Sequence, residues 1–216
     1  EYFAELVKNS DAAQLPLAEN ESVEEFLTFI TPVIFDENLY ATRRSGEDDI
    51  IKNSATNFYK GDISKEEVEK FYEAQRDPKD TTPISYGLNS QLVKENGKIY
   101  ENVYKSGGLY GEAIDQIIYW LEKANAVAEN DAQRNYTNLL IDYYKTGDLN
   151  TWDEYNIAWV QDSVSMIDYV NGFIEDYGDP MGMKATWEAV VNFKDLEATK
   201  RSSIISQNAQ WFEDNS

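Results

Sequence analysis

An acid and a phenol, Glu175 and Tyr177, lie two residues apart in a segment rich in β-branched and aromatic residues. That composition is typical of a strand, and strand side chains alternate between two faces. The alternation predicts that four side chains share one face: Asn171, Phe173, Glu175 and Tyr177. Because a Gly-Asp-Pro turn follows, Glu175 and Tyr177 can both point into a cleft, although an edge strand with a polar outer face explains the same pattern.

Several kinds of catalytic site are excluded by composition, because the sequence contains no His and no Cys. A catalytic zinc site usually needs His ligands, and Ser-His or Cys-His nucleophile systems need a His base. The Gly107-Gly108 pair lacks the Gly-Lys-Ser/Thr of a phosphate loop, and the acids of 46–49 lack the spacing of a calcium loop. We therefore predict no metal site within this chain. Paired carboxylates remain possible, but 40 acids make a meaningless pair common.

The net charge of −21 narrows the range of partners. A nucleic-acid backbone or an anionic membrane surface would be repelled, whereas a cationic group such as a peptide N-terminus would be attracted. Solubility alone also explains such a charge. The longest apolar runs are too short to span a membrane. We expect no nucleic-acid partner and no membrane insertion, and a cytoplasmic or a periplasmic bacterial location fits equally well.

The first half of the chain combines helices with a hairpin. Capping-box spacings, Ser22 with Glu25 and Ser64 with Glu67, predict two helix starts, and the polar stretch 36–50 predicts a loop. Asn96-Gly97, flanked by apolar pairs, predicts a hairpin near 91–104.

The second half predicts three helices, two strands and a last helix. The helices are expected over 112–129, over 132–145 with a stop at Gly147, and from Thr151 with Glu154 at capping-box spacing. Strands are expected over 167–177 and 185–191, packed against the helices over 112–129 and 132–145 and against a further helix over 194–212. The fold class is thus α+β, predominantly helical, with a small β-sheet or partial barrel in the C-terminal third.

Two runs carry a family resemblance, "NGFIEDYGDPMGMKATWEAVVNF" at 171–193 and "PISYGLNSQLVKENGK" at 83–98. They resemble dipeptidyl peptidase III, a family of two-lobed zinc dipeptidyl aminopeptidases, and most of all its bacterial branch. The resemblance is clearest from Thr82 to the C-terminus. It implies that residues 1–216 are a single fragment of the lower, substrate-binding lobe, which has a β-barrel core surrounded by helices.

The resemblance also implies roles for the residues of the first run. Glu175 would hold the ammonium group of an oligopeptide substrate, Tyr177 would polarise the scissile carbonyl, and Asn171 and Phe173 would belong to the same substrate-binding strand. The peptide would extend that strand. The zinc would sit on a His-Glu-x-x-Gly-His helix of the other lobe, in polypeptide beyond this chain. The isolated chain would therefore be inactive, and its partners would be the peptide and the zinc lobe.

A second interpretation is a stand-alone, aromatic-rich helical protein that binds glycans. Its support is the abundance of Tyr, Trp, Asn and Asp, which suits stacking on sugars and recognition of hydroxyl groups. Core packing explains the aromatics equally well, because Trp120, Trp152 and Trp159 fall at helical spacing among apolar neighbours.

Overall fold

The computed structural model describes residues 1–36, 49–54 and 56–215. Its first elements are α1 (Tyr2–Lys8), a short 3-10 helix (Ala12–Gln14) and α2 (Val23–Phe35). The ring centroids of Phe3 and Phe35 lie 5.7 Å apart and join α1 to α2. The predicted capping box of Ser22 and Glu25 is confirmed at the start of α2. Most of the predicted loop 36–50 lies outside the described residues.

A three-stranded sheet, called sheet A, combines β1 (Tyr59–Lys60), β2 (Ser90–Glu95) and β3 (Lys98–Val103) in that order. Strands β2 and β3 form the predicted hairpin, and Asn96 and Gly97 both take positive φ in its two-residue turn, as such a tight turn requires. Helix α3 (Lys65–Glu73) begins at the predicted Ser64–Glu67 capping box. Its buried Val68 and Tyr72 pack with Leu92 of the sheet.

A layer of three helices follows: α4 (Gly111–Ala126), α5 (Asp131–Thr146) and α6 (Leu149–Gln161). All three were predicted, and Gly147 ends α5 in the left-handed conformation as expected. The predicted start of α6 at Thr151 is two residues late. The side chain of Asp148 accepts a hydrogen bond from the backbone N–H of Asn150, so the cap lies before Leu149.

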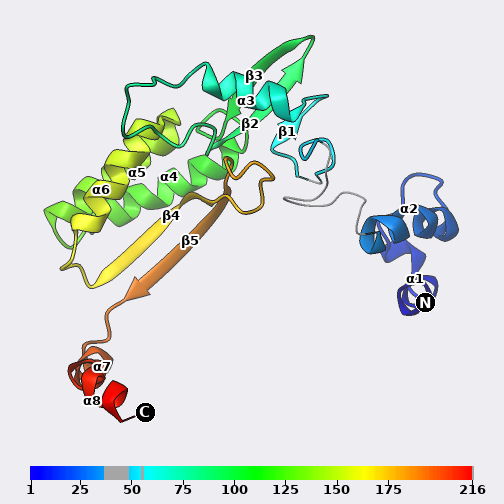
Figure 1. Ribbon diagram of the computed structural model, residues 1–216. Coiled ribbons are helices and arrows are strands. Elements are labelled where there is room, and N and C mark those ends of the chain that lie inside the picture. The colour runs from blue at the N-terminus through cyan, green and yellow to red at the C-terminus, as the bar shows by residue number, and fades with distance from the viewer. Residues whose placement is uncertain (37–48, 55, 216) are drawn as a thin grey trace.

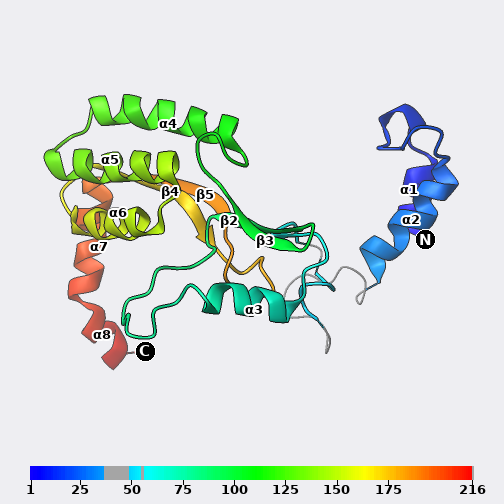
Figure 2. The ribbon, with the colours of Figure 1, turned by 90° about the horizontal axis from the view of Figure 1, so that it is seen from above.

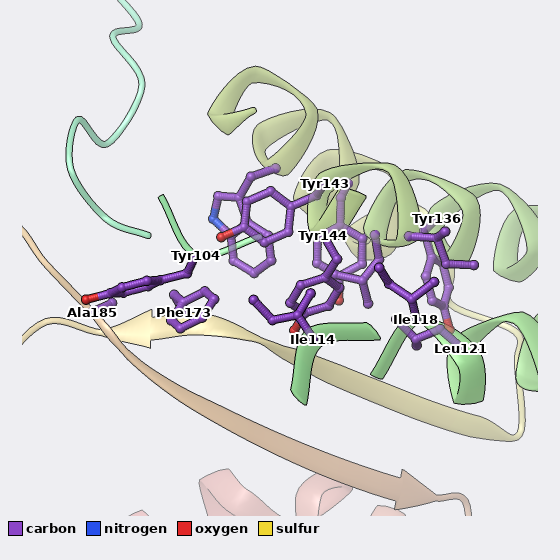
Figure 3. Close-up of a cluster of buried hydrophobic side chains, with 13 residues drawn as sticks. Tyr104, Ile114, Ile118, Leu121, Tyr136, Tyr143, Tyr144, Phe173 and Ala185 are labelled. Carbon is purple, nitrogen blue, oxygen red and sulfur yellow. The ribbon is translucent and has the colours of Figure 1, made fainter. Parts of the chain in front are cut away.

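Strands β4 (Ile167–Glu175) and β5 (Thr186–Phe193) pair antiparallel in a second sheet, called sheet B. Helices α4–α6 lie together along one face of this ribbon (Figure 1, Figure 2). Side chains from the helices, β4 and the residue after β3 fill the space between them (Figure 3). The two predicted strands are therefore confirmed, but β4 ends at Glu175 rather than at Tyr177.

The prediction for the last helix is wrong in both its continuity and its packing. The expected helix over 194–212 is divided at Asn208 into α7 (Leu196–Gln207) and α8 (Ala209–Asp214), and both lie beyond the end of β5 instead of against the sheet (Figure 1). Their large apolar side chains are exposed. Trp120 of α4 is exposed as well, so core packing does not explain this tryptophan, whereas Trp152 is buried. Amphipathic spacing gives a helix an apolar face, but it does not determine what covers that face.

In the part of the chain that the structure describes, every helix is too short or too polar to pass through a lipid bilayer.

Candidate functional site

The end of β4 carries the two residues singled out by their spacing. The strand contains a bulge between Phe173 and Glu175: Phe173 pairs with Trp187 of β5, and Glu175 pairs with the next residue, Thr186. Ile174 is therefore an extra residue on β4, and it packs with Phe173 toward the helices. Strict alternation is broken at this point.

The bulge overturns the predicted shared face of the four side chains. Paired residues of an antiparallel ribbon point to the same side, and neighbours along a strand point to opposite sides. Phe173 and Trp187 face one side, so Glu175 and Thr186 face the other. Tyr177 lies beyond the end of β4 in a turn, and its side chain is 58% exposed.

Asn171 and Phe173 point toward α5 and α4. The hydroxyl of Tyr144 in α5 donates a hydrogen bond to Asn171 Oδ1 at 2.8 Å, and Trp187 Nε1 donates to the same hydroxyl at 2.8 Å. The ring centroid of Phe173 lies 4.8 Å from that of Tyr104. The substrate-binding role of Asn171 and Phe173 thus stays a prediction, and their side chains lie on the face opposite to Glu175.

Glu188 of β5 lies on the same face as Glu175, because it is two residues from Thr186 along the strand. Burial and the neighbouring carboxyl of Glu175 raise the pKa of the Glu188 carboxyl above its ordinary value. Among the described residues, Glu188 Oε1 is buried and has no hydrogen-bond partner. Sequence reasoning missed Glu188, because only the register of β4 against β5 brings it to Glu175.

The connection between β4 and β5 reaches sheet A, and two charged residues make the link. Asp179 and Lys184 are both almost fully buried, at 2% and 0% exposure. Tyr59 of β1 donates a hydrogen bond to Asp179 Oδ2 at 3.0 Å, and Lys184 Nζ donates to Tyr72 OH of α3 at 2.6 Å. These residues were also missed, because their signal in the sequence is that of an ordinary polar turn.

An apolar cavity of about 530 Å³ opens on the helix side of sheet B. Tyr104, Tyr110, Ile114, Phe173 and Trp187 are among its lining residues. Glu175 and Tyr177 do not line it. The cavity therefore adjoins the candidate site through Phe173 and not through Glu175 or Tyr177.

The donor set of the described residues does not fit a zinc centre. The sequence has no His and no Cys, and the described residues contain no group of three or more acids placed to hold a metal. Catalytic zinc in proteins is usually held by His with or without acids.

Comparison with known proteins gives a consistent set of matches. The sequence model of Peptidase family M49 matches residues 85–213, more than half of the chain. Dipeptidyl peptidase 3 of Dictyostelium discoideum is 25% identical over 180 residues, covering 74% of this chain and 25% of that protein. Dipeptidyl peptidase 3 of Homo sapiens is 32% identical over 88 residues, covering 39% of this chain and 12% of that protein. The chain thus spans no more than a quarter of these relatives.

Two solved structures share the fold. DPP III from Caldithrix abyssi matches with a TM-score of 0.56 and 22% identity, over 97% of this chain and 37% of that one. Dipeptidyl-peptidase III from Corallococcus sp. strain EGB matches with a TM-score of 0.52 and 21% identity, over 74% of this chain and 28% of that one. At such identities the likeness concerns the fold alone.

Proposed function

Because the chain belongs to peptidase family M49, we propose that it is the substrate-binding part of a zinc-dependent dipeptidyl aminopeptidase, an enzyme that releases dipeptides from the N-terminus of oligopeptides. Residues 1–216 would form part of its lower lobe. The observation that carries the proposal is the position of Glu175 and Tyr177, which stand at the exit of β4 inside the range that the family model matches.

Glu175 would bind the substrate's N-terminal ammonium. Its face of sheet B also carries the Glu188 carboxyl, and the whole chain has a net charge of −21, so a cation is favoured there. A hydrogen bond between charged groups contributes roughly 1.5–3 kcal/mol. An ammonium group fixed at one point sets how many residues reach the reaction centre, which accounts for release of dipeptides.

Tyr177 would act on the scissile carbonyl. A phenolic O–H that donates to an oxygen on which negative charge develops stabilises the transition state more than the ground state. The exposed turn that holds Tyr177 leaves its side chain accessible to a peptide on the Glu175 face. Asn171 and Phe173, whose side chains face the helices, would contribute through the backbone of β4 as the peptide extends the strand.

The zinc ligands would come from polypeptide outside these residues, since the chain offers no fitting donor set. When bound, zinc supplies a nucleophilic water and polarises the carbonyl. Exposed apolar side chains support docking of the remaining polypeptide on this part: Val191, Phe193, Leu196, Trp211 and Phe212. The family match and the names of the two solved structures favour the peptidase over the glycan-binding alternative.

Two substitutions in the full-length protein test the assignment. Glu175→Gln removes the charge that holds the ammonium, so we expect KM for one dipeptidyl substrate to rise by an amount equivalent to roughly 1.5–3 kcal/mol. Tyr177→Phe removes only a hydroxyl, so we expect kcat to fall by roughly 10²–10³-fold with little change in stability.

The matched control is Tyr119→Phe, which removes the hydroxyl of a half-exposed tyrosine on α4. Its kinetics should match those of the wild type. Near-wild-type kcat/KM in both Glu175→Gln and Tyr177→Phe would mean that these roles are assigned to the wrong residues.

A further inference from the structure

The connection between β4 and β5 holds Tyr177 at its start and is attached to sheet A near its end. Its turn at Asp176–Asp179 is closed by a hydrogen bond from Asp179 N–H to Asp176 O at 2.9 Å. At the other end, Ala185 N–H donates to Leu88 O, just before β2, at 2.9 Å. Tyr177 thus belongs to a segment whose position depends on sheet A as well as on β4.

Asp179 fixes the shape of this segment from within. Its Oδ2 accepts hydrogen bonds from the backbone N–H groups of Met183 and Lys184, each at 2.9 Å, and from the Tyr59 hydroxyl at 3.0 Å. Its Oδ1 accepts a further bond from Met181 N–H at 3.2 Å. A single buried carboxylate therefore holds three backbone amides of the segment and one side chain of β1.

Lys184 attaches the segment to α3 and β2. Its Nζ donates to Tyr72 OH at 2.6 Å, to Ser90 O at 3.0 Å and to Ser90 Oγ at 3.1 Å, with a longer contact to Gly87 O at 3.2 Å. Two of these acceptors are backbone carbonyls, that of Ser90 at the start of β2 and that of Gly87 just before it. The ammonium is therefore bound to the main chain at this point. A fully buried ammonium needs this many acceptors to offset its lost hydration.

The countercharge of Lys184 lies one hydrogen bond further away. Glu101 Oε1 of β3 accepts from Tyr72 OH at 2.8 Å and from Ser90 Oγ at 2.6 Å. The hydroxyls of Tyr72 and Ser90 therefore link the Lys184 ammonium to the Glu101 carboxylate through hydrogen bonds. Gly87 is required beside them, because its φ is +86° and a Cβ there would lie 2.6 Å from Tyr72 OH.

From these contacts we infer that Lys184 and Asp179 are positioning residues for Tyr177: they fix its turn against sheet A and α3, so that the phenol is held in place without either residue touching the substrate. This inference rests on the proposed function. The attachment is strong in physical terms, because removing one partner of a buried charge network leaves the others uncompensated. A displacement of about 1 Å at a reacting group costs roughly 10²-fold in rate.

The test is a double-mutant cycle in the full-length protein. Lys184→Met should lower kcat by roughly 10-fold to 100-fold, with KM less affected. In a Tyr177→Phe background the same substitution should lower kcat less than about twofold, because the phenol that it positions is already absent. Equal losses of kcat in both backgrounds, or a wild-type kcat in Lys184→Met, would overturn the inference.

A control variant separates positioning from general destabilisation. Leu121 of α4 belongs to the cluster of buried side chains between the helices and sheet B, and it lies at the end of that cluster away from Phe173 and Ala185 (Figure 3). Leu121→Ala removes core contacts there. It should lower the melting temperature while kcat, measured well below melting, stays within about twofold of the wild type. If Lys184→Met does not fold, Ser90→Ala, which removes one of the two linking hydroxyls, takes its place in the cycle with a smaller loss expected.

A structural readout keeps the inference apart from the proposed function. Hydrogen exchange of the Met183 amide, which Asp179 holds, should become faster in Lys184→Met and stay unchanged in Leu121→Ala. Unchanged exchange in Lys184→Met would overturn the positioning role. A wild-type kcat in Tyr177→Phe would instead overturn the assignment of Tyr177 in the proposed function.

Discussion

Gly172 of β4 lies directly against Trp152 of α6. A Cβ at this position would lie 2.4 Å from Cη2 of the buried Trp152 side chain. We predict that Gly172→Ala lowers the free energy of unfolding by roughly 1–3 kcal/mol, because the ribbon and the indole must separate to accommodate a methyl group. Urea unfolding followed by tryptophan fluorescence measures this loss.

Gly111→Ala is the matched control at the residue scale. A Cβ on Gly111 would meet its nearest neighbour, Lys105 O, at 3.5 Å, an ordinary contact, and the residue opens α4. Alanine is the better helix former by about 1 kcal/mol, so this variant should be neutral or slightly stabilised. Equal losses in Gly172→Ala and Gly111→Ala would show that contact with Trp152 is not the cause.

At the scale of elements, α3 depends on its capping box and supplies Tyr72 to the Lys184 network. Ser64 Oγ accepts from Glu67 N–H at 3.3 Å, and Glu67 Oε2 accepts from Ser64 N–H at 3.1 Å. We predict that Ser64→Ala lowers the free energy of unfolding by about 1 kcal/mol, because the cap is lost. Chemical denaturation followed by circular dichroism measures the change.

Ser203→Ala tests whether the cap itself is responsible. Ser203 is part of α7, and its hydroxyl donates to the backbone carbonyl of Lys200 within the same helix. Alanine suits the interior of a helix at least as well, so stability should stay within about 0.5 kcal/mol of the wild type. A stability loss in Ser203→Ala as large as that in Ser64→Ala would contradict the capping explanation.

At the scale of the whole molecule, alkaline pH changes the free energy of unfolding through two kinds of buried group. The two changes have opposite signs. Burial lowers the pKa of Lys184 to about 8 from 10.5, despite the opposing carboxylates of Glu101 and Asp179. Between these values the unfolded chain binds more protons than the folded one, so this group makes stability rise with pH. Burial raises the pKa of tyrosines such as Tyr72 and Tyr143, so the tyrosines make stability fall above about pH 10.

We therefore predict that the stability difference between the wild type and Lys184→Met increases from pH 8 to pH 10, by up to roughly 3 kcal/mol. Urea unfolding at several pH values gives this difference, in which the contribution of tyrosines that do not contact Lys184, such as Tyr143, cancels. Lys52→Met is the control: the hydrogen bond to Asp62 raises the Lys52 pKa, so Lys52 does not lose its proton earlier in the folded state than in the unfolded state, and its removal should give no such increase. A pH-independent difference between Lys184→Met and the wild type would contradict the burial of a charged Lys184.

The sequence by itself determined the local elements of this protein. The capping boxes at Ser22 and Ser64, the Asn96-Gly97 turn and the stop at Gly147 are set by residues within a few positions of one another, and all four were predicted. The run at 171–193 also indicated the family and drew attention to Glu175 and Tyr177. Such signals can be recognised in the sequence because helix caps, tight turns and hydrophobic periodicity depend on residues that are close together along the chain.

Only the tertiary structure decided how those elements orient the candidate site. The bulge at Ile174 arises from the pairing of β4 with β5. It places the side chain of Glu175 on the same face of sheet B as Glu188 and on the face opposite to that of Phe173. The burial of Lys184 depends on Tyr72 and Ser90, which lie 112 and 94 residues away along the chain. A residue's own neighbours in sequence do not determine these features, because register and burial come from contacts between segments that meet only in the folded chain.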